Sequence, residues 1–277
     1  MHTLIKFISR KEYVDDFLAG RLYMNSLDFF WNNGFDDQKD IFEGIICTVP
    51  VQDMTFLPID FQSVQATDCR FRAEGYKYCN ILCFYKQEFY SDGPFIHFDY
   101  NTKMTEFGEY AVIIKNKQEL LRRVDKAIKA NEYKYLCGSV CYHKQKLNGK
   151  ESKEGNRLHL KVSDRYFEID ELIRLGYRIT KRDCFDKDIS YKVQNEWRIS
   201  VYRGIKETNP FVLDIGRISD IVKVVPSAML ENELKKNISL YISNTQDCYY
   251  GNIDKREMRE LFYQLGDNKT SLFASIG

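Results

Sequence analysis

Apolar residues recur along this chain with two different spacings, and each spacing predicts its own set of elements. Apolar positions three and four residues apart, with charged residues between them, are typical of a helix that buries one face. Ser26 and Ser227 each precede such a segment and are expected to cap its first turn. The predicted helices are residues 10–20, 27–33, 117–131, 227–237 and 254–266.

The first and the last of these helices have the clearest apolar stripes. Gly20 and Gly266 follow the stripes as stop signals, and Asp254 with Glu257 resembles a capping box for the last helix. The stripe residues are Tyr13, Val14, Phe17 and Leu18 in the first helix and Met258, Leu261, Phe262 and Leu265 in the last.

Short apolar or alternating runs that end at polar residues predict strands. The last two runs are expected to pair with each other around a short link of sequence RISD. Strands and helices mix without regular alternation, which favours a single α+β domain over residues 1–277, with mixed or antiparallel sheets and flanking helices. The predicted strands are residues 4–8, 21–26, 41–51, 78–86, 110–115, 133–143, 210–216 and 221–226, with a further strand within 191–204.

Composition and charge exclude few classes of protein. The chain has 277 residues, of which 44% are hydrophobic, 29% charged and 14% aromatic, and its formal charge is +1. This balance does not require a nucleic acid or an anionic membrane as partner. No apolar segment approaches the roughly 18 residues of a membrane span, and the first 20 residues do not resemble a signal peptide. We therefore expect a cytoplasmic protein with reduced thiols.

Cysteine and histidine residues offer little evidence for a metal site. Cys79 and Cys83 are separated by three residues, as are Cys137 and Cys141, which His143 follows. Both groups lie in apolar runs and lack the two-residue gap of a zinc knuckle, so we expect core cysteines and no bound metal. The four histidines form no local triad signature.

The segment YKVQNEWRISVYRG, residues 191–204, contains the most suggestive polar pair. Gln194 and Glu196 are two residues apart, directly ahead of the apolar residues 199–201. If the segment is a strand, both side chains lie on one face. The simplest alternative is a structural glutamate that pairs with Lys192, Arg198 or another cation.

The order of elements around this pair resembles that of ADP-ribosyltransferases, with a looser match to the DarT-like enzymes that modify nucleic acid. The shared features are a short opening strand, a helix that ends G-x-L-Y, a polar-aromatic strand, and a late strand headed by Gln-x-Glu. The closer resemblance is to a group of bacterial and phage-associated proteins that share the blocks IKF…FLAGRLYMNSLDFF…EG and NEWRI. The likeness covers about the first 45 residues and residues 190–226.

The resemblance implies a role for each matching residue. Glu196 would bind a ribose hydroxyl and face the positive charge that develops as the nicotinamide–ribose bond breaks, and Gln194 would orient the acceptor. The residues that would bind NAD, as substrate, are Tyr23, Asn25, Ser26, Phe30, Arg21 and Arg198. Two departures are Lys6 and Phe7, which stand where such enzymes place His or Arg. An acidic cluster, Asp36, Asp37, Asp40 and Glu43, also suits a pyrophosphate poorly.

We therefore expect an ADP-ribosyltransferase-like enzyme of bacterial or phage conflict, a toxin or phage-defence protein that cleaves NAD. Its acceptor would be a nucleic acid or a protein, and no membrane is expected as partner. One alternative is a non-catalytic sensor or interaction protein in phage defence. Another is a metal-dependent nuclease that uses the acidic residues 36–43. The transferase and the non-catalytic protein differ in one respect: Glu196 lines a cleft in the transferase and is held in an ion pair in the non-catalytic protein.

Overall fold

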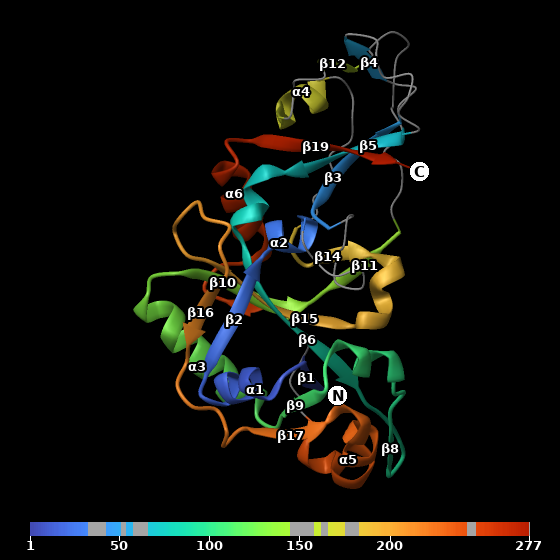
Figure 1. The fold of residues 1–277 in the computed structure, drawn as a ribbon, viewed down its shortest axis with the longest axis vertical. Helices are drawn as coiled ribbons and strands as arrows, with labels where there is room; N and C mark the ends of the chain where they lie inside the picture. The colour runs from blue at the N-terminus through green and yellow to red at the C-terminus, as the bar shows by residue number, and fades with distance from the viewer. Residues whose placement is uncertain are drawn as a thin grey trace. The chain divides into compact units, whose positions relative to one another are not determined.

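The computed structural model is a mixed α/β structure whose sheets are mostly antiparallel (Figure 1). This confirms the α+β class that the sequence predicts. The structure describes residues 1–32, 43–50, 54–57, 66–144, 158–161, 166–174, 183–242 and 248–276. No helix in this described part of the chain combines the length and the apolar character needed to cross a membrane.

The chain forms two compact units, each built from three segments that are distant in sequence. The sequence predicts a single domain over residues 1–277. The division into two compact units does not test this, so it stays a prediction. The first unit comprises residues 1–26, 80–141 and 190–254, and the second comprises residues 27–79, 142–189 and 255–277.

The first unit is organised around a nine-stranded sheet with β6, Asn80–Glu88, near its centre. The main path is β17-β9-β1-β6-β15-β10-β18, and β2 pairs with both β6 and β16. These strands are β1 His2–Ile8, β2 Arg21–Ser26, β9 Tyr110–Ile114, β10 Lys134–Ser139, β15 Glu196–Tyr202, β16 Phe211–Asp214, β17 Val222–Pro226 and β18 Tyr250–Gly251. A separate hairpin joins β7, Tyr90–Asp92, to β8, Phe95–His97.

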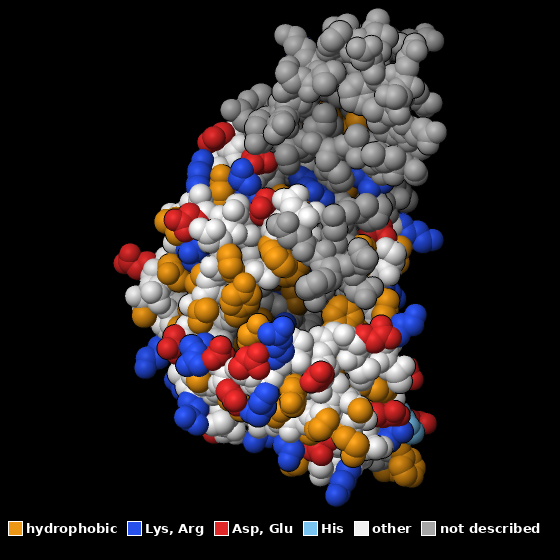
Figure 2. All heavy atoms as spheres, viewed as in Figure 1, with side chains coloured by type: hydrophobic (Ala, Val, Ile, Leu, Met, Phe, Trp, Pro, Cys, Tyr) orange, Lys and Arg blue, Asp and Glu red, His pale blue; other side chains and the backbone are white. Residues whose placement is uncertain are grey.

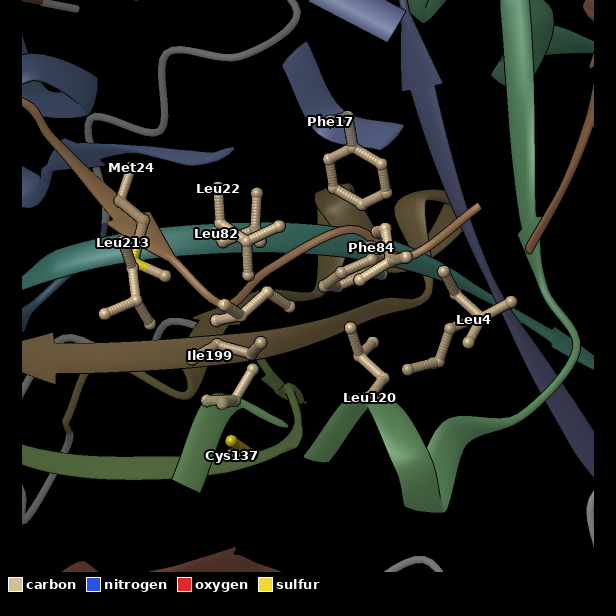
Figure 3. Close-up of a cluster of buried hydrophobic side chains, with 14 of the residues drawn as sticks. Leu4, Phe17, Leu22, Met24, Leu82, Phe84, Leu120, Cys137, Ile199 and Leu213 are labelled. Carbon is tan, nitrogen blue, oxygen red and sulfur yellow. The ribbon is translucent and has the colours of Figure 1, made fainter. Parts of the chain in front are cut away.

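Apolar side chains cover both faces of this sheet. On one face, α1 (Lys11–Leu18) and α3 (Lys117–Ala130) pack against the strands, with Phe17 and Leu120 in the same cluster as Leu4, Phe84 and Ile199 (Figure 3). On the other face, α5 (Leu230–Asn237) packs through Leu230 and Leu234 against β1 and β9. The core of the unit therefore lies on the two faces of the sheet.

The second unit has a four-stranded antiparallel sheet in the order β13-β19-β5-β3. Helix α6 packs against the 3₁₀ turn Glu74–Tyr78, where the Tyr76 and Phe262 rings lie 5.1 Å apart. A Cβ atom at Gly75 would lie 1.7 Å from the Phe262 carbonyl oxygen, so this close approach requires glycine. The elements are α2 Leu27–Asn32, β3 Ile45–Pro50, β4 Met54–Leu57, β5 Ala66–Ala73, β11 Cys141–His143, β12 Leu158–Lys161, β13 Tyr166–Glu168, α4 Ile169–Arg174, β14 Asp186–Asp188, α6 Lys255–Leu265 and β19 Lys269–Ile276.

Local predictions from the sequence are correct more often than predictions of pairing. The predicted helices over 10–20, 117–131 and 254–266 appear as α1, α3 and α6, and α1 is followed by Gly20 with φ +90°. The predicted pair of strands over 210–216 and 221–226 is wrong, because β16 pairs with β2 and β17 pairs with β9.

Three smaller predictions also differ from the structure. Tyr13 is 51% exposed, so it lies outside the buried stripe of α1. Ser227 donates its hydroxyl to the Gly108 carbonyl, at 2.6 Å, and α5 begins three residues later, at Leu230. The predicted strand over 133–143 is divided at Val140 into β10 and β11.

Charged side chains of both signs are interspersed on the described surface of the face in Figure 2. This distribution agrees with the formal charge of +1. It gives no single-sign region on this face that would by itself indicate a nucleic acid or an anionic surface as partner.

Candidate functional site

Glu196 is the first residue of β15, a strand that lies between β6 and β10 with all seven side chains buried. The turn before it is fixed to β6, because Lys86 N–H donates to the Asn195 carbonyl at 2.8 Å and Asn195 Nδ2 donates to the Lys86 carbonyl at 2.6 Å. Asn195 has φ +36°, in the left-handed region. The position of Glu196 is therefore determined by the central strand β6.

Gln194 does not belong to this strand. It ends the 3₁₀ turn Ile189–Gln194, and Asn195 separates it from β15. The alternation that would place Gln194 and Glu196 on one face therefore does not apply. Both side chains are buried.

Glu196 forms a buried ion pair with Arg198, two residues along the same face of β15. Arg198 Nε lies 2.7 Å from Glu196 Oε2, and only 2% of the Arg198 side chain is exposed. Removing two charges from water is costly unless each finds a partner, and this geometry meets that need. Arg198 therefore holds the Glu196 carboxylate in one orientation.

Lys6 of β1 brings a second cation toward this pair. Its Nζ donates to the Cys83 carbonyl of β6 at 3.0 Å. Burial lowers the pKa of Lys6, while the charges of Cys83 and Glu196 act in the opposite direction. The carboxylate of Glu196 is thus close enough to influence Lys6, and the group comprises two cationic side chains and one anionic one.

Strand register places Asn25 on the same face of the sheet as Glu196 and Arg198. On β6, Tyr85 is paired with Glu196, Cys83 with Arg198, and Ile81 with Asn25 of β2. Directly paired residues project from the same face, and residues two apart on a strand do so as well. Asn25 Oδ1 is buried and has no hydrogen-bond partner among the described residues.

The strands β1 and β2 both lie along one edge of β6 and leave a gap between them. In the described register, β1 pairs with residues 85–88 of β6, and β2 pairs with residues 80 and 81. The Cys83 carbonyl that accepts from Lys6 lies within this gap. The predicted residues Asn25, Glu196 and Arg198 therefore lie around the place where two strands diverge.

The other predicted ligand residues have varied positions. Tyr23 and Arg21 alternate with Leu22 and so share the Asn25 side of β2; Tyr23 is 56% exposed, and Arg21 pairs with Asp16. Ser26 is fully buried and projects from the opposite side of β2 to Asn25.

Phe30 belongs to α2 in the second unit, where its ring packs edge-on against Phe29 with the centroids 5.6 Å apart. Within the first unit, the structure brings Glu196, Arg198 and Asn25 onto one sheet face.

Three residues of the acidic cluster that suggests a nuclease lie outside the described residues, namely Asp36, Asp37 and Asp40. Glu43 is described and buried, and its carbonyl oxygen accepts a hydrogen bond from Arg72 Nε at 3.0 Å. Within the described ranges, no three His, Cys, Asp or Glu side chains are grouped as metal ligands would be.

The cysteines are less uniform than the sequence suggests. Cys79 and Cys137 are buried, Cys83 is partly buried, and Cys141 is exposed. Burial raises the pKa of the Cys137 thiol. The expectation of a core position is therefore wrong for Cys141, whose Sγ lies 3.6 Å from the Tyr249 hydroxyl.

Two residues beside Glu196 were not predicted as part of the site, namely Lys6 and Tyr85. A lysine within the apolar run of residues 4–8 is a signal that could have indicated Lys6. Tyr85 has no comparable signal, because its position opposite Glu196 depends on the register of β6 with β15.

Comparison with protein-family models, with curated proteins and with solved structures finds no match for this chain. The resemblance to ADP-ribosyltransferases therefore has no support from a relative.

Proposed function

We propose that this protein is an ADP-ribosyltransferase-like enzyme that cleaves NAD and transfers ADP-ribose to a macromolecule, in bacterial or phage conflict. The observation that carries the proposal is a buried carboxylate, Glu196, that is paired with Arg198 on one sheet face and lies within electrostatic reach of Lys6. A nucleotide diphosphate is anionic and the reacting ribose becomes cationic, so cations beside one fixed carboxylate suit both parts of the substrate.

Each residue has a distinct task in this proposal. Glu196 stabilises the oxocarbenium-like transition state, and Arg198 positions the Glu196 carboxylate through the bond to Oε2. Lys6 attracts the diphosphate. Asn25, whose buried Oδ1 has no partner among the described residues, accepts a hydrogen bond from the nicotinamide amide group.

A second function is favoured by the same ion pair. A carboxylate held by a guanidinium within one buried strand also suits a structural role, in which the protein is a non-catalytic sensor or interaction protein in phage defence. The two functions differ in one measurable respect, which is whether the parent protein releases nicotinamide from NAD.

The test compares Glu196→Gln with Glu12→Gln, a control at a glutamate of α1 whose side chain is 63% exposed. Nicotinamide release and thermal unfolding are measured on the parent and both variants, with activity assayed well below each melting temperature. The transferase predicts turnover by the parent and a loss of about 10²–10³ in rate in Glu196→Gln. No turnover by the parent, together with a large drop in melting temperature in Glu196→Gln alone, would contradict the transferase and favour the structural role.

A further inference from the structure

Cys83 marks a point at which solvent reaches the middle of the first unit's sheet. It lies on the central strand β6, where every other residue from 80 to 87 is buried, and it is itself partly exposed. Residues 85–88 of β6 pair with β1, and residues 80 and 81 pair with β2. Cys83 therefore lies in the gap between these two strands, where neither of them pairs with β6.

The two strands beside this gap are open at the same place. Lys6 is the one residue of β1 that is not buried, and Asn25 of β2 is also partly exposed. Asn25 pairs with the residue two positions before Cys83, and its buried Oδ1 has no hydrogen-bond partner among the described residues. Buried acceptors without a partner are uncommon in native proteins. The exposure and the unsatisfied acceptor together indicate room for a small ligand at Cys83.

Two cations and one anion lie near the thiol. Arg198 is the direct partner of Cys83 on β15, so the two side chains project from one face with Cβ atoms about 5 Å apart. Lys6 Nζ donates to the Cys83 carbonyl at 3.0 Å, and its charge interacts with Cys83 and with Glu196. Since Glu196 carries the single negative charge of the three side chains, the group is positive overall when Lys6 is protonated.

A thiol reacts through its thiolate, and a partly exposed cysteine beside lysine or arginine is typical of a reactive one. We propose that Cys83 is an activated nucleophilic thiol that forms a covalent bond with a carbon electrophile at the candidate site. This inference goes beyond the proposed function, since it requires neither NAD nor the transfer of ADP-ribose.

The surrounding residues account for each part of the reaction. The thiol proton passes to the amine form of Lys6, whose pKa is lowered by burial, and a thiolate beside an ammonium results. The thiolate sulfur then attacks the electrophilic carbon with its electron pair. A sulfur–carbon bond forms while the bond to the leaving group breaks, and the leaving group departs with the electron pair of that bond.

The test measures the alkylation of each cysteine by iodoacetamide in the folded parent between pH 6 and pH 9, by mass spectrometry of the digested protein. Cys248 is the internal control, because it is exposed. An ordinary thiol has a pKa of about 8.5, so only about 10% of it is thiolate at pH 7.5. The rate at Cys83 should already be near its maximum at pH 7.5, whereas the rate at the control should still rise several-fold up to pH 9.

Lys6→Met tests the source of this reactivity, and Lys115→Met, at an exposed lysine of the first unit, is the matched control. Lys6→Met should slow the alkylation of Cys83 at pH 7.5 by about 3- to 10-fold and leave that of Cys248 unchanged. Lys115→Met should change neither rate. Circular dichroism checks that each variant is folded, and if Lys6→Met is not, the pH profile of the parent decides.

A Cys83 that stays unmodified in the folded parent would overturn the inference, because its exposure would then give no access to the thiol. A rate at Cys83 with the same pH dependence as that at Cys248 would also overturn it. So would a fast rate that Lys6→Met leaves unchanged, because the proton would not pass to Lys6.

Nicotinamide release by the parent is measured separately and distinguishes this inference from the proposed function. Release of nicotinamide by a protein with an unreactive Cys83 contradicts this inference alone. Alkylation of Cys83 that depends on Lys6, without release of nicotinamide, contradicts the transferase alone.

Discussion

Asp183 is buried in the second unit with its Oδ2 atom 3.5 Å from the ammonium of Lys255, the first residue of α6. Its Oδ1 accepts the Phe185 N–H at 2.8 Å, and its own N–H donates to Asp186 Oδ2 at 2.9 Å. Burial, followed by the charge of Asp186, raises the pKa of Asp183 to about 6, while Lys255 acts in the opposite direction. Two nearby carboxylates thus share one turn.

This raised pKa predicts a pH dependence of stability. An unfolded aspartate has a pKa of about 3.9, so the folded protein binds this proton more tightly than the unfolded chain does. The stabilisation is therefore complete below about pH 4 and is lost as the pH rises to about 6, with a size on the order of 3 kcal/mol. Asp183→Asn cannot titrate and should lack this component.

Urea unfolding of the parent and of Asp183→Asn between pH 4 and pH 7 checks the prediction. The free energy of unfolding of the parent should fall relative to that of the variant over this range. Asp170→Asn, at an exposed aspartate of α4, is the control and should follow the parent. Parallel curves for the parent and Asp183→Asn would show that Asp183 does not titrate with a raised pKa.

Two neighbouring residues in the predicted apolar stripe of the last helix are buried to different extents. Phe262 of α6 is fully buried against Tyr76, whereas Leu261 is only partly buried. Phe262→Ala should therefore cost about 3–5 kcal/mol of unfolding free energy, and Leu261→Ala less than about 2 kcal/mol. Equal losses in denaturant unfolding would mean that both side chains dock to the same extent.

The different burial of two cysteines predicts a difference in both stability and thiol reactivity. Cys137 lies in the apolar cluster of the first unit, whereas Cys141 is exposed. Cys137→Ser should cost about 1–3 kcal/mol, because it buries a hydroxyl, and Cys141→Ser should change stability by less than about 0.5 kcal/mol. In the native protein, a thiol reagent should modify Cys141 rapidly and Cys137 slowly.

Metal analysis extends this prediction. Because the four cysteines are expected to bind no metal, purified protein should contain no stoichiometric zinc. One tightly bound zinc per chain, lost in Cys141→Ser, would overturn the assignment of these thiols.

How far the sequence could predict this structure is clear from particular elements. The 3-4 spacing of α3 and α6 indicated helices because that signal is local. Strand partners are not local, which is why β16 was paired with β17 in prediction and with β2 in the structure. Gly20 was predicted as a stop, and the reason is now specific: a Cβ atom there would lie 1.9 Å from the Gly216 carbonyl oxygen.

The candidate site shows the same difference between local features, which the sequence predicts, and features that depend on distant residues or on one backbone angle. The sequence indicated Glu196 and its partner Arg198, two residues apart on one strand. It did not indicate that a left-handed residue, Asn195, would separate Gln194 from β15, because a single backbone angle leaves no periodic signal. The position of Tyr85 opposite Glu196 was also not predictable, since it depends on a register between strands more than 100 residues apart.

The Glu196–Arg198 pair gives the last prediction. Arg198→Met keeps most of the side-chain volume but leaves the Glu196 carboxylate buried without its guanidinium. Breaking a buried pair in this way should lower the free energy of unfolding by about 3–5 kcal/mol. Adding Glu196→Gln to Arg198→Met removes the buried charge that has lost its guanidinium, so the double variant should recover part of the loss.

A double-mutant cycle by urea unfolding measures the coupling between the two side chains. The matched control is Arg256 with Glu260, a pair whose side chains are 78% and 54% exposed and whose coupling should be below about 1 kcal/mol. A coupling for Glu196 and Arg198 as small as that of the control would show that the guanidinium does not hold the carboxylate. In that case Arg198 loses its positioning task in the transferase, and the structural alternative loses the observation that favours it.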